Sequence, residues 1–429
     1  MLVHVALPGS NIEPVDSLAE LASLTETAHA VVVDRVVQRR REPHPAHYVG
    51  HGKAEEIGLR ARHFGADTII FDNDLSPAQI RELEKITQCK MIDRSELILD
   101  IFARRARTHE AKLQVELAQL QYTYPRLTRM WGHLDTLTAT AAGGAGAVGG
   151  IGTRGPGEKQ LEIDRRLVNK RLTQLRQQIK QIDRRKQRQV RSRSDHFTVS
   201  LVGYTNAGKS TLLNLLTGAK TYVEDKLFAT LDTKTSRWNL ARDLHVLLSD
   251  TVGFIRNLPH HLIASFRATL EEAIHADLLL HVVDASHPQA DRQLRDVHQV
   301  LKEIGCESKD VLLVLNKIDH RPNSMIDTMR TLYPDAAAIS ARKGLGIDAL
   351  IDRVSARVTG EKLHLRVVCP QSEGHIPSFL RAHGSIISEE YDDSVLTLEA
   401  YLGRRQLPNL QRLKPQIFEI LSGLVDETA

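Results

Sequence analysis

Cysteine, aromatic residues and long apolar runs are all scarce in this chain of 429 residues. Its three cysteines, Cys89, Cys306 and Cys369, are far apart in the sequence, which argues against both a disulfide framework and a zinc site. No apolar run approaches the length of about 18 residues that a membrane span needs. The first residues also lack the basic and apolar regions of a signal peptide. We therefore expect a cytoplasmic protein without a membrane span.

The rest of the composition is that of a globular protein. Apolar residues make up 41% of the chain and charged residues 26%, which is ordinary for soluble proteins, and the length predicts two to four domains. The net charge of +4 is unevenly distributed, because residues 158–194 contain 13 Lys or Arg against 4 Asp or Glu, a local charge of +9. A basic element on an otherwise mildly acidic protein is typical of nucleic-acid binding. A solvated charged helix would have the same composition.

One stretch has the pattern of a phosphate-binding loop. The apolar run Phe197–Val202 leads into Gly203–Ser210, with the sequence GYTNAGKS, and an apolar helical pattern follows. Glycines at both ends of the loop allow a tight turn whose N–H groups point at a phosphate. Lys209 adds positive charge at the outer phosphates, and the Ser210 hydroxyl can bind Mg²⁺. The sequence therefore predicts a nucleoside triphosphate site.

A second Mg²⁺ anchor is predicted at Asp250. The tetrad Asp250-Thr251-Val252-Gly253 follows the apolar run Leu244–Leu248, as expected of an aspartate that ends a strand beside the phosphate loop. The same tetrad is also a common turn, so it is weak evidence alone. Phe254 comes next, where a Ras-type enzyme has its water-orienting glutamine. Phenylalanine cannot orient water, so we expect slow intrinsic hydrolysis and assign no catalytic base.

A third motif indicates which base is bound. Asn316-Lys317-Ile318-Asp319 follows the apolar run Val311–Leu315, and Ser340-Ala341-Arg342 follows the run Ala336–Ile339. The carboxylate of Asp319 can accept hydrogen bonds from the N1–H and the amino group of guanine. Adenine lacks that donor pair, so a site built this way rejects it. In order and spacing these elements resemble the guanine-nucleotide motifs of translation-factor-like GTPases, and GTP is the expected substrate.

The segment Phe228-Ala229-Thr230-Leu231-Asp232 lies between the first two motifs. A GTPase supplies a threonine from this region to Mg²⁺ and the γ-phosphate. Thr230, Thr233 and Thr235 are all candidates, and spacing alone does not choose among them.

Smaller domains are predicted at both ends of the chain. Alternating strand and helix patterns predict an α/β unit at the N-terminus, with strands at Val3–Leu7, Ala30–Val37 and Thr68–Phe71 and helices at Pro14–Thr27, Ala54–Phe64 and Pro77–Thr87. At the C-terminus we expect strands at Leu363–Cys369, Gly384–Ser388 and Val395–Tyr401 and helices at Ile376–His383 and Arg404–Leu413. The C-terminal unit shows no group of catalytic residue types, so we interpret it as a docking or packing module.

Two apolar seams with heptad spacing lie between the N-terminal unit and the phosphate loop. The first consists of Leu113, Leu117, Leu120, Tyr124, Leu127, Trp131 and Leu134, and the second of Leu161, Val168, Leu172, Leu175, Ile179 and Ile182. They predict an antiparallel helical hairpin, in which Pro125 is expected to interrupt the first helix. The glycine-rich loop 139–157 would form its tip, where Arg154 could pair with phosphate or stack on a base.

These features closely resemble the HflX family of bacterial GTPases. The resemblance is carried by GGIGTRGPGEKQLEIDRR (149–166), RARTHEAKLQVELAQL (105–120) and the phosphate loop GYTNAGKST (203–211). It implies GTP hydrolysis coupled to binding of the large (50S) ribosomal subunit and its ribosomal RNA, with splitting of stalled ribosomes in the GTP-bound form, as part of a stress response. One departure is the length of the tip, since 139–148 makes this loop longer than the shorter family form.

The resemblance also assigns roles to individual residues. It implies that Thr230 is the threonine that ligates Mg²⁺ together with Ser210, and that Lys209, Thr230 and Asn206 act in catalysis, Asn206 by helping to hold a K⁺ ion. The complete set of expected nucleotide contacts is Gly203, Tyr204, Thr205, Asn206, Ala207, Gly208, Lys209, Ser210, Thr211, Phe228, Ala229, Thr230, Leu231, Asp232, Asp250, Thr251, Val252, Gly253, Asn316, Lys317, Ile318, Asp319, Ser340, Ala341 and Arg342.

The sequence thus predicts a monomeric α/β protein with four domains. These are an α/β domain at 1–108, the hairpin at 109–195, a P-loop GTPase domain at 196–360 and a small α+β domain at 361–429. Two other functions fit the same residues: an RNA-remodelling protein of ribosome assembly that uses GTP as a timer, and a GTPase that docks on a protein partner.

Overall fold

The computed structural model describes residues 1–9, 13–130, 165–182, 197–219, 227–228, 234–241, 244–256, 267–320, 323–359, 362–392 and 394–423. The chain forms two compact units, each built from separate stretches of sequence. The first unit comprises 1–192, 222–233 and 251–272, and the second comprises 193–221, 234–250 and 273–429. The glycine-rich loop 139–157 and the residues 229–233 lie outside the described part of the chain.

The first unit contains a four-stranded parallel sheet in the order β2-β1-β3-β4. Its strands are β1 Leu2–Ala6, β2 Arg35–Arg39, β3 Thr68–Phe71 and β4 Lys90–Asp93, and its helices are α1 Pro14–Thr27, α2 His51–His63, α3 Pro77–Thr87 and α4 Arg94–Arg105. Apolar side chains of the strands and of α2 and α3 form its core, among them Val3, Ile57, Ile69, Phe71 and Leu83.

The start of α3 shows how local sequence determines these boundaries. Pro77 occupies the first turn, and the Ser76 side chain and Gln79 form a reciprocal capping box, which satisfies N–H groups that the first turn of a helix leaves open. The predicted bounds of α1 and α3 are confirmed. The predicted strand at Ala30–Val37 was placed too early, because β2 begins at Arg35.

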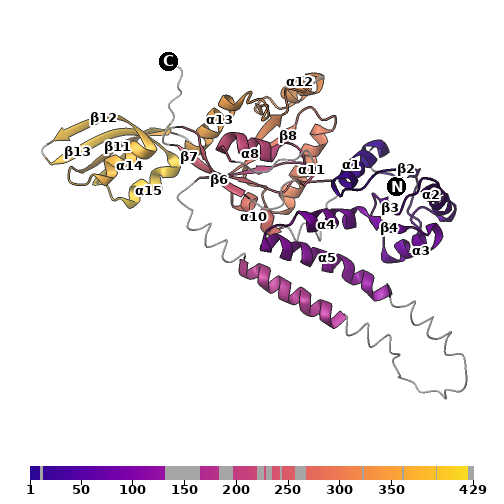
Figure 1. Ribbon diagram of the computed structural model, residues 1–429. Helices are drawn as coiled ribbons and strands as arrows, with labels where there is room; N and C mark the ends of the chain where they lie inside the picture. Colours follow the sequence, from indigo (N-terminus) through magenta and orange to yellow (C-terminus); the bar gives the residue numbers. More distant parts are fainter. Residues whose placement is uncertain are drawn as a thin grey trace, which may run out of the picture. The chain divides into compact units, whose positions relative to one another are not determined.

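The two apolar seams pack against each other in the first unit. α5 spans His109–Met130, and residues 165–182 form a second helix beside it (Figure 1). Leu113, Leu117, Leu172 and Leu175 are the buried centre of this packing. Tyr124 accepts from Asn169 at 2.9 Å and Glu116 pairs with Arg171 at 2.6 Å, so the two helices run in opposite directions, as predicted. The expected interruption at Pro125 was wrong, because α5 continues through it, and packing along the seam outweighs the low helix propensity of proline.

The second unit contains a six-stranded sheet in the order β10-β9-β8-β5-β7-β6. Its strands are β5 Thr198–Val202, β6 Lys234–Asn239, β7 His245–Asp250, β8 Leu278–Asp284, β9 Asp310–Asn316 and β10 Ala337–Ala338. All neighbours are parallel except β6 and β7, which are antiparallel. The helices are α8 Lys209–Thr217, α10 Arg267–His275, α11 Ala290–Glu303, α12 Asn323–Leu332 and α13 Ile347–Thr359, and the carboxyl ends of the parallel strands meet at one edge, where such sheets bind ligands.

The C-terminal part of the second unit is a separate antiparallel sheet in the order β12-β13-β11-β14. Its elements are β11 Lys362–Pro370, α14 His375–His383, β12 Gly384–Asp392, β13 Val395–Gly403, the short 3-10 helix Arg404–Gln406, α15 Leu407–Arg412 and β14 Ile417–Gly423. Leu365, Val367, Leu380 and Leu398 are fully buried in its core. The expected fold class, an α/β P-loop protein with an α/β N-terminal part, a helical region and a small C-terminal sheet, is confirmed, while the exact domain boundaries stay predictions.

Candidate functional site: a guanine-nucleotide pocket

The phosphate loop connects β5 to α8 and requires glycine at both ends. Gly203 has φ +148°, and a Cβ there would lie 2.2 Å from the carbonyl oxygen of Val282. Gly208 has φ +92°, and a Cβ there would lie 2.3 Å from Nδ2 of Asn316. Both values are far inside any possible contact distance, so a side chain at either position would displace a neighbouring strand or loop. Tyr204, Thr205, Asn206 and Ala207 form the rest of the loop.

Lys209, the first residue of α8, is buried inside this loop. Its Nζ donates to the carbonyl oxygens of Gly203 and Tyr204, both at 2.9 Å. Burial lowers the pKa of Lys209 to about 8, and the charge of Asp250 opposes that decrease. The ammonium is therefore held where phosphate oxygens would favour its charged form, and the N-terminal end of α8, which includes Ser210 and Thr211, also favours an anion there.

Ser210 and Asp250 form a pair of oxygen donors next to the loop. The Ser210 hydroxyl donates to Oδ2 of Asp250 at 2.6 Å, and Asp250 is fully buried at the end of β7. A hydroxyl and a carboxylate are the hard oxygen ligands that Mg²⁺ accepts, and Mg²⁺ in nucleotide sites takes few protein ligands because phosphates and water complete its shell. The donor set therefore fits Mg²⁺.

Asn316 connects two loops of the site. At the end of β9, its Nδ2 donates to the carbonyl oxygen of Ala207 at 2.8 Å, and its Oδ1 accepts from the N–H of Ala341 at 2.9 Å. One side chain thus ties the phosphate loop to the segment Ser340–Arg342. The sequence placed Asn316 in the site but gave no indication of this bracing role.

Asp319 is held in position for a base. The Ser340 hydroxyl donates to its Oδ1 at 2.7 Å, and Lys343 lies 3.6 Å from its Oδ2. The hydrogen bond from Ser340, helped by its own backbone N–H and the charge of Lys343, holds the pKa of Asp319 below its usual range. An ionised carboxylate is the acceptor that the guanine donor pair needs. Neighbouring Lys317 pairs with Asp284 at 2.8 Å, and the N–H of Ile318 donates to Ile339.

The remaining predicted site residues fall outside this group. Ala229, Thr230, Leu231 and Asp232 lie outside the described residues, so the metal and catalytic roles of Thr230 stay predictions. Phe228 and the tetrad residues Thr251, Val252 and Gly253 are buried and belong to the first unit.

His281 is a buried residue that the sequence analysis missed. It lies on β8, and burial, with the positive charges of His298 and Lys209, lowers its pKa to about 3. It is therefore neutral near Lys209 at physiological pH. The only sequence signal was a single polar residue within the apolar run Leu278–Val283.

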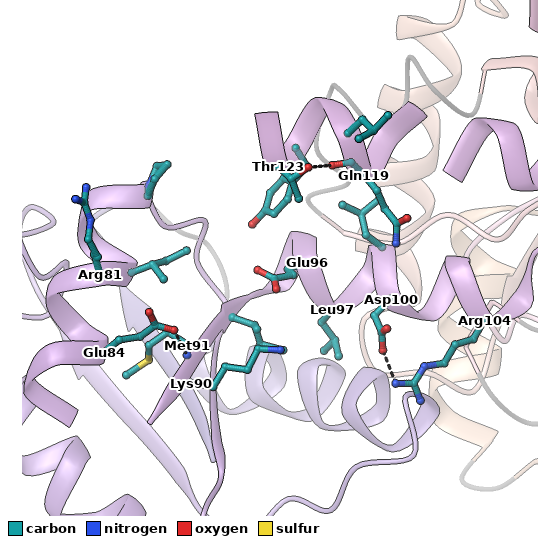
Figure 2. Close-up of a pocket in the computed structure, with 16 residues that line it drawn as sticks. Arg81, Glu84, Lys90, Met91, Glu96, Leu97, Asp100, Arg104, Gln119 and Thr123 are labelled. Carbon is teal, nitrogen blue, oxygen red and sulfur yellow. Dashed lines mark hydrogen bonds and ion pairs between the residues drawn. The ribbon is translucent and has the colours of Figure 1, made fainter. Parts of the chain in front are cut away.

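A cavity of about 880 Å³ lies within the first unit between α3, β4, α4 and α5 (Figure 2). Figure 2 shows Asp100 paired with Arg104, at 2.8 Å, and Thr123 hydrogen-bonded to Gln119. Glu84, another acidic residue of its wall, accepts from the N–H of Met91. Because the carboxylates of Asp100 and Glu84 already have partners within the wall, we do not interpret this cavity as a reaction site. In the described parts of the chain no helix is both long and apolar enough to cross a membrane.

Three family models match successive parts of the chain. Residues 15–103 match the N-terminal domain of GTP-binding GTPases, 105–193 match the middle region of the same proteins, and 198–317 match the 50S ribosome-binding GTPase domain. The last of these contains the phosphate loop, Asp250 and the start of the base-recognition motif.

Similar proteins cover nearly the whole chain. GTPase HflX of Lacrimispora saccharolytica is 45% identical over 389 residues, which is 90% of this chain and 89% of that protein. GTPase HflX of Escherichia coli strain K12 is 44% identical over 382 residues, 88% of this chain and 87% of that protein. Among solved structures, the complex of SsGBP with GDP matches 82% of this chain and 97% of its own at 24% identity, with a TM-score of 0.44.

Proposed function

The chain belongs to the HflX family of GTPases, and from this premise we propose that it binds the large ribosomal subunit and, in its GTP form, splits stalled ribosomes into subunits. GTP hydrolysis then allows release. We further propose that the protein acts as a monomer in the cytoplasm. The observation that carries the proposal is the match of 198–317 to the 50S ribosome-binding GTPase domain, combined with a helical hairpin that is basic on its second helix.

The surface of the second hairpin helix supports contact with ribosomal RNA. Arg165, Arg166 and Lys170 are exposed, and cations in such positions can neutralise phosphates of an RNA backbone. Arg171 is exposed too, but it is engaged with Glu116 through two hydrogen bonds, at 2.6 and 2.8 Å. The first three residues are therefore the better candidates for RNA contact.

Binding to ribosomes in different nucleotide states tests the proposal. Purified 70S ribosomes and isolated large subunits would be sedimented with the protein in GTP, GDP or a nonhydrolysable GTP analogue. We expect co-sedimentation with the large subunit and a shift from 70S particles to free subunits with the analogue. Binding to large subunits without any loss of 70S particles would instead favour the assembly role, in which GTP is a timer. If the protein binds no ribosomal particle with any of the three nucleotides, docking on a protein partner would be favoured.

At the nucleotide, we propose that the chemistry is mostly positioning. Lys209 and the loop N–H groups would hold the phosphates, while Ser210 and Thr230 would ligate Mg²⁺ with Asp250 behind them. The metal, when bound, neutralises charge that develops on the phosphates. Because Phe254 cannot orient water, the remaining catalytic charge has to come from another group, and Asn206 is our candidate for holding it.

Potassium is the ion that we propose Asn206 to hold. Asn206 is the fourth residue of the phosphate loop, has φ +61° and is exposed. A cation beside the β- and γ-phosphates would act where other GTPases use an arginine. We expect faster GTP hydrolysis in K⁺ than in Na⁺ at equal ionic strength, and loss of the difference in Asn206→Ala. Equal wild-type rates in both salts, with and without ribosomes, would exclude this role.

A further inference from the structure

Buried charges surround the side chain of Arg256 in the first unit. Arg256 is the sixth residue after Asp250 and is 6% exposed. Its guanidinium lies 3.1 Å from the carboxylate of Glu20 and 3.7 Å from that of Asp72, and it donates to the Ser17 hydroxyl at 3.0 Å. Nothing in the nucleotide chemistry described above uses these groups.

A second arginine completes the group. Arg94, the first residue of α4, lies 2.7 Å from Asp72 and 3.1 Å from Glu20. Its Nη2 also donates to the backbone carbonyl oxygen of Arg256 at 3.2 Å. We call Glu20, Asp72, Arg94 and Arg256 the buried charge cluster. It fixes residue 256 twice, by its side chain and by its backbone.

The carboxyl group of Asp72 is ionised within this cluster. Burial alone would raise the pKa of Asp72, but the hydrogen bond from His4, the charge of Arg94, the Ser17 hydroxyl and the charge of Arg256 together hold it far below its usual range. Two arginines and two carboxylates leave the cluster electrically balanced. Removing one member of such a buried group leaves an uncompensated buried charge, so the four residues depend on one another.

The other end of α4 contacts a second segment. Phe102 packs edge-on against Phe228, with ring centroids 4.6 Å apart and an interplanar angle of 71°, and Phe228 is 2% exposed. Arg94 and Phe102 are eight residues apart, or about 12 Å along the helix. Phe228 precedes Thr230 by two residues, and Arg256 follows Asp250 by six. Helix α4 therefore contacts two chain segments. One precedes Thr230 and the other follows Asp250, and both of these residues are expected at the Mg²⁺ site.

We propose that α4 and the buried charge cluster form a latch that transmits the nucleotide state to the N-terminal part of the first unit, with Arg256 as its positioning residue. Five residues separate Arg256 from Asp250, so their Cα atoms can be at most about 20 Å apart along the chain, which limits how far Asp250 can move while Arg256 stays fixed. The latch releases or tightens as the segment after Asp250 changes with GTP or GDP. This inference rests on the GTPase reaction and not on the proposed ribosome splitting.

Hydrogen exchange of the full chain tests the latch. Peptides that cover α1 and Arg94–Arg105 would be measured with GDP and with a nonhydrolysable GTP analogue bound, and binding of each nucleotide would be verified separately by fluorescence. In the wild type we expect the exchange of these peptides to differ between the two nucleotides. In Arg256→Met, which keeps an unbranched apolar stem and removes the guanidinium group, we expect that difference to be lost while both nucleotides still bind.

Two further variants make the test decisive. Glu20→Gln is a milder change, because Asp72 remains to pair with both arginines, and should reduce the difference without unfolding the chain. Arg60→Met is the matched control: it removes an arginine that donates twice to Asp34, at 2.9 and 2.8 Å, in the same part of the first unit, and should leave the difference intact. A wild type without a difference, an Arg256→Met variant that keeps it, or an Arg60→Met variant that loses it would each overturn the latch. Failure of nucleotide binding itself would contradict the GTPase assignment instead.

Discussion

At the scale of single residues, the nucleotide site depends on a few side chains whose surroundings determine their charge. Lys209 is buried among backbone carbonyls, Asp319 accepts a hydrogen bond from Ser340, and Asn316 spans two loops. In each case, the sequence motif predicts the type of residue, whereas the hydrogen bonds and the charge of its side chain depend on the fold.

Base selection should depend on Asp319. In Asp319→Asn, one acceptor for the guanine donor pair becomes a donor, so the affinity for GTP should fall, roughly 10- to 150-fold if a charge-assisted hydrogen bond of about 1.5–3 kcal/mol is lost. Xanthine has a carbonyl where guanine has its amino group, so xanthosine triphosphate should bind the variant better than it binds the wild type. Competition titrations with both nucleotides measure the change. Unaltered GTP affinity in Asp319→Asn would remove this residue from the site.

Nucleotide binding should take up a proton at mildly alkaline pH. The pKa of Lys209 is lowered to about 8 by burial, and bound phosphates raise it, because they favour the ammonium form. Between the two pKa values, binding therefore protonates Lys209, and affinity falls as pH rises above about 8. Calorimetry of GDP binding in two buffers of different ionisation enthalpy should show roughly three quarters of a proton taken up at pH 8.5 and about a tenth of a proton at pH 7. The absence of uptake at pH 8.5 would mean that Lys209 is already charged in the free site.

At the scale of helices and strands, the position of an element could be predicted where the sequence has a capping signal or a repeated apolar spacing, and not where a short segment has neither. The bounds of α1 and α3 were predictable because proline and a capping residue mark their starts, and the heptad seam predicted the pairing of α5 with 165–182. The strands β4, β6, β8 and β14 were missed. β4 has only four residues, and β14 is an edge strand with Ile417 and Ile420 exposed, so neither shows a clear alternation.

The second hairpin helix should govern electrostatic binding to ribosomes. Replacing Arg165, Arg166 and Lys170 with glutamine removes three exposed cations and should reduce the slope of log affinity against log salt by up to about three. A variant with Arg171→Gln alone is the matched control, since that arginine is engaged with Glu116, and its slope should change less. An unchanged slope in the triple variant would show that this helix face is only solvated.

At the scale of the whole molecule, the site is assembled from segments that no local pattern connects. The motifs predicted which residues would meet at the ends of β5, β7 and β9, because parallel strands bring their carboxyl ends together. They could not predict that Asn316 would brace Ala207 and Ala341, nor that Arg256 would be buried beside Glu20, since both depend on contacts between distant parts of the chain.

Ribosome splitting should require the predicted tip of the hairpin. Deleting 139–157 should leave GTP affinity unchanged, because every described residue of the nucleotide pocket lies elsewhere in the chain, and should abolish the conversion of 70S particles to subunits. Sedimentation of ribosomes with the GTP analogue provides the measurement. A deletion variant that still splits ribosomes would assign that activity to another surface.

The division of the first unit into separate stretches of sequence also has a consequence for synthesis of the chain. Residues 1–192 leave the ribosome first, but the unit is completed only by 222–233 and 251–272. Until Arg256 and Phe228 emerge, Glu20, Asp72 and Phe102 lack partners that they have in the finished protein. The first unit is therefore completed only after β5, β6 and β7 of the nucleotide-binding sheet have been translated, and before β8, β9 and β10 follow.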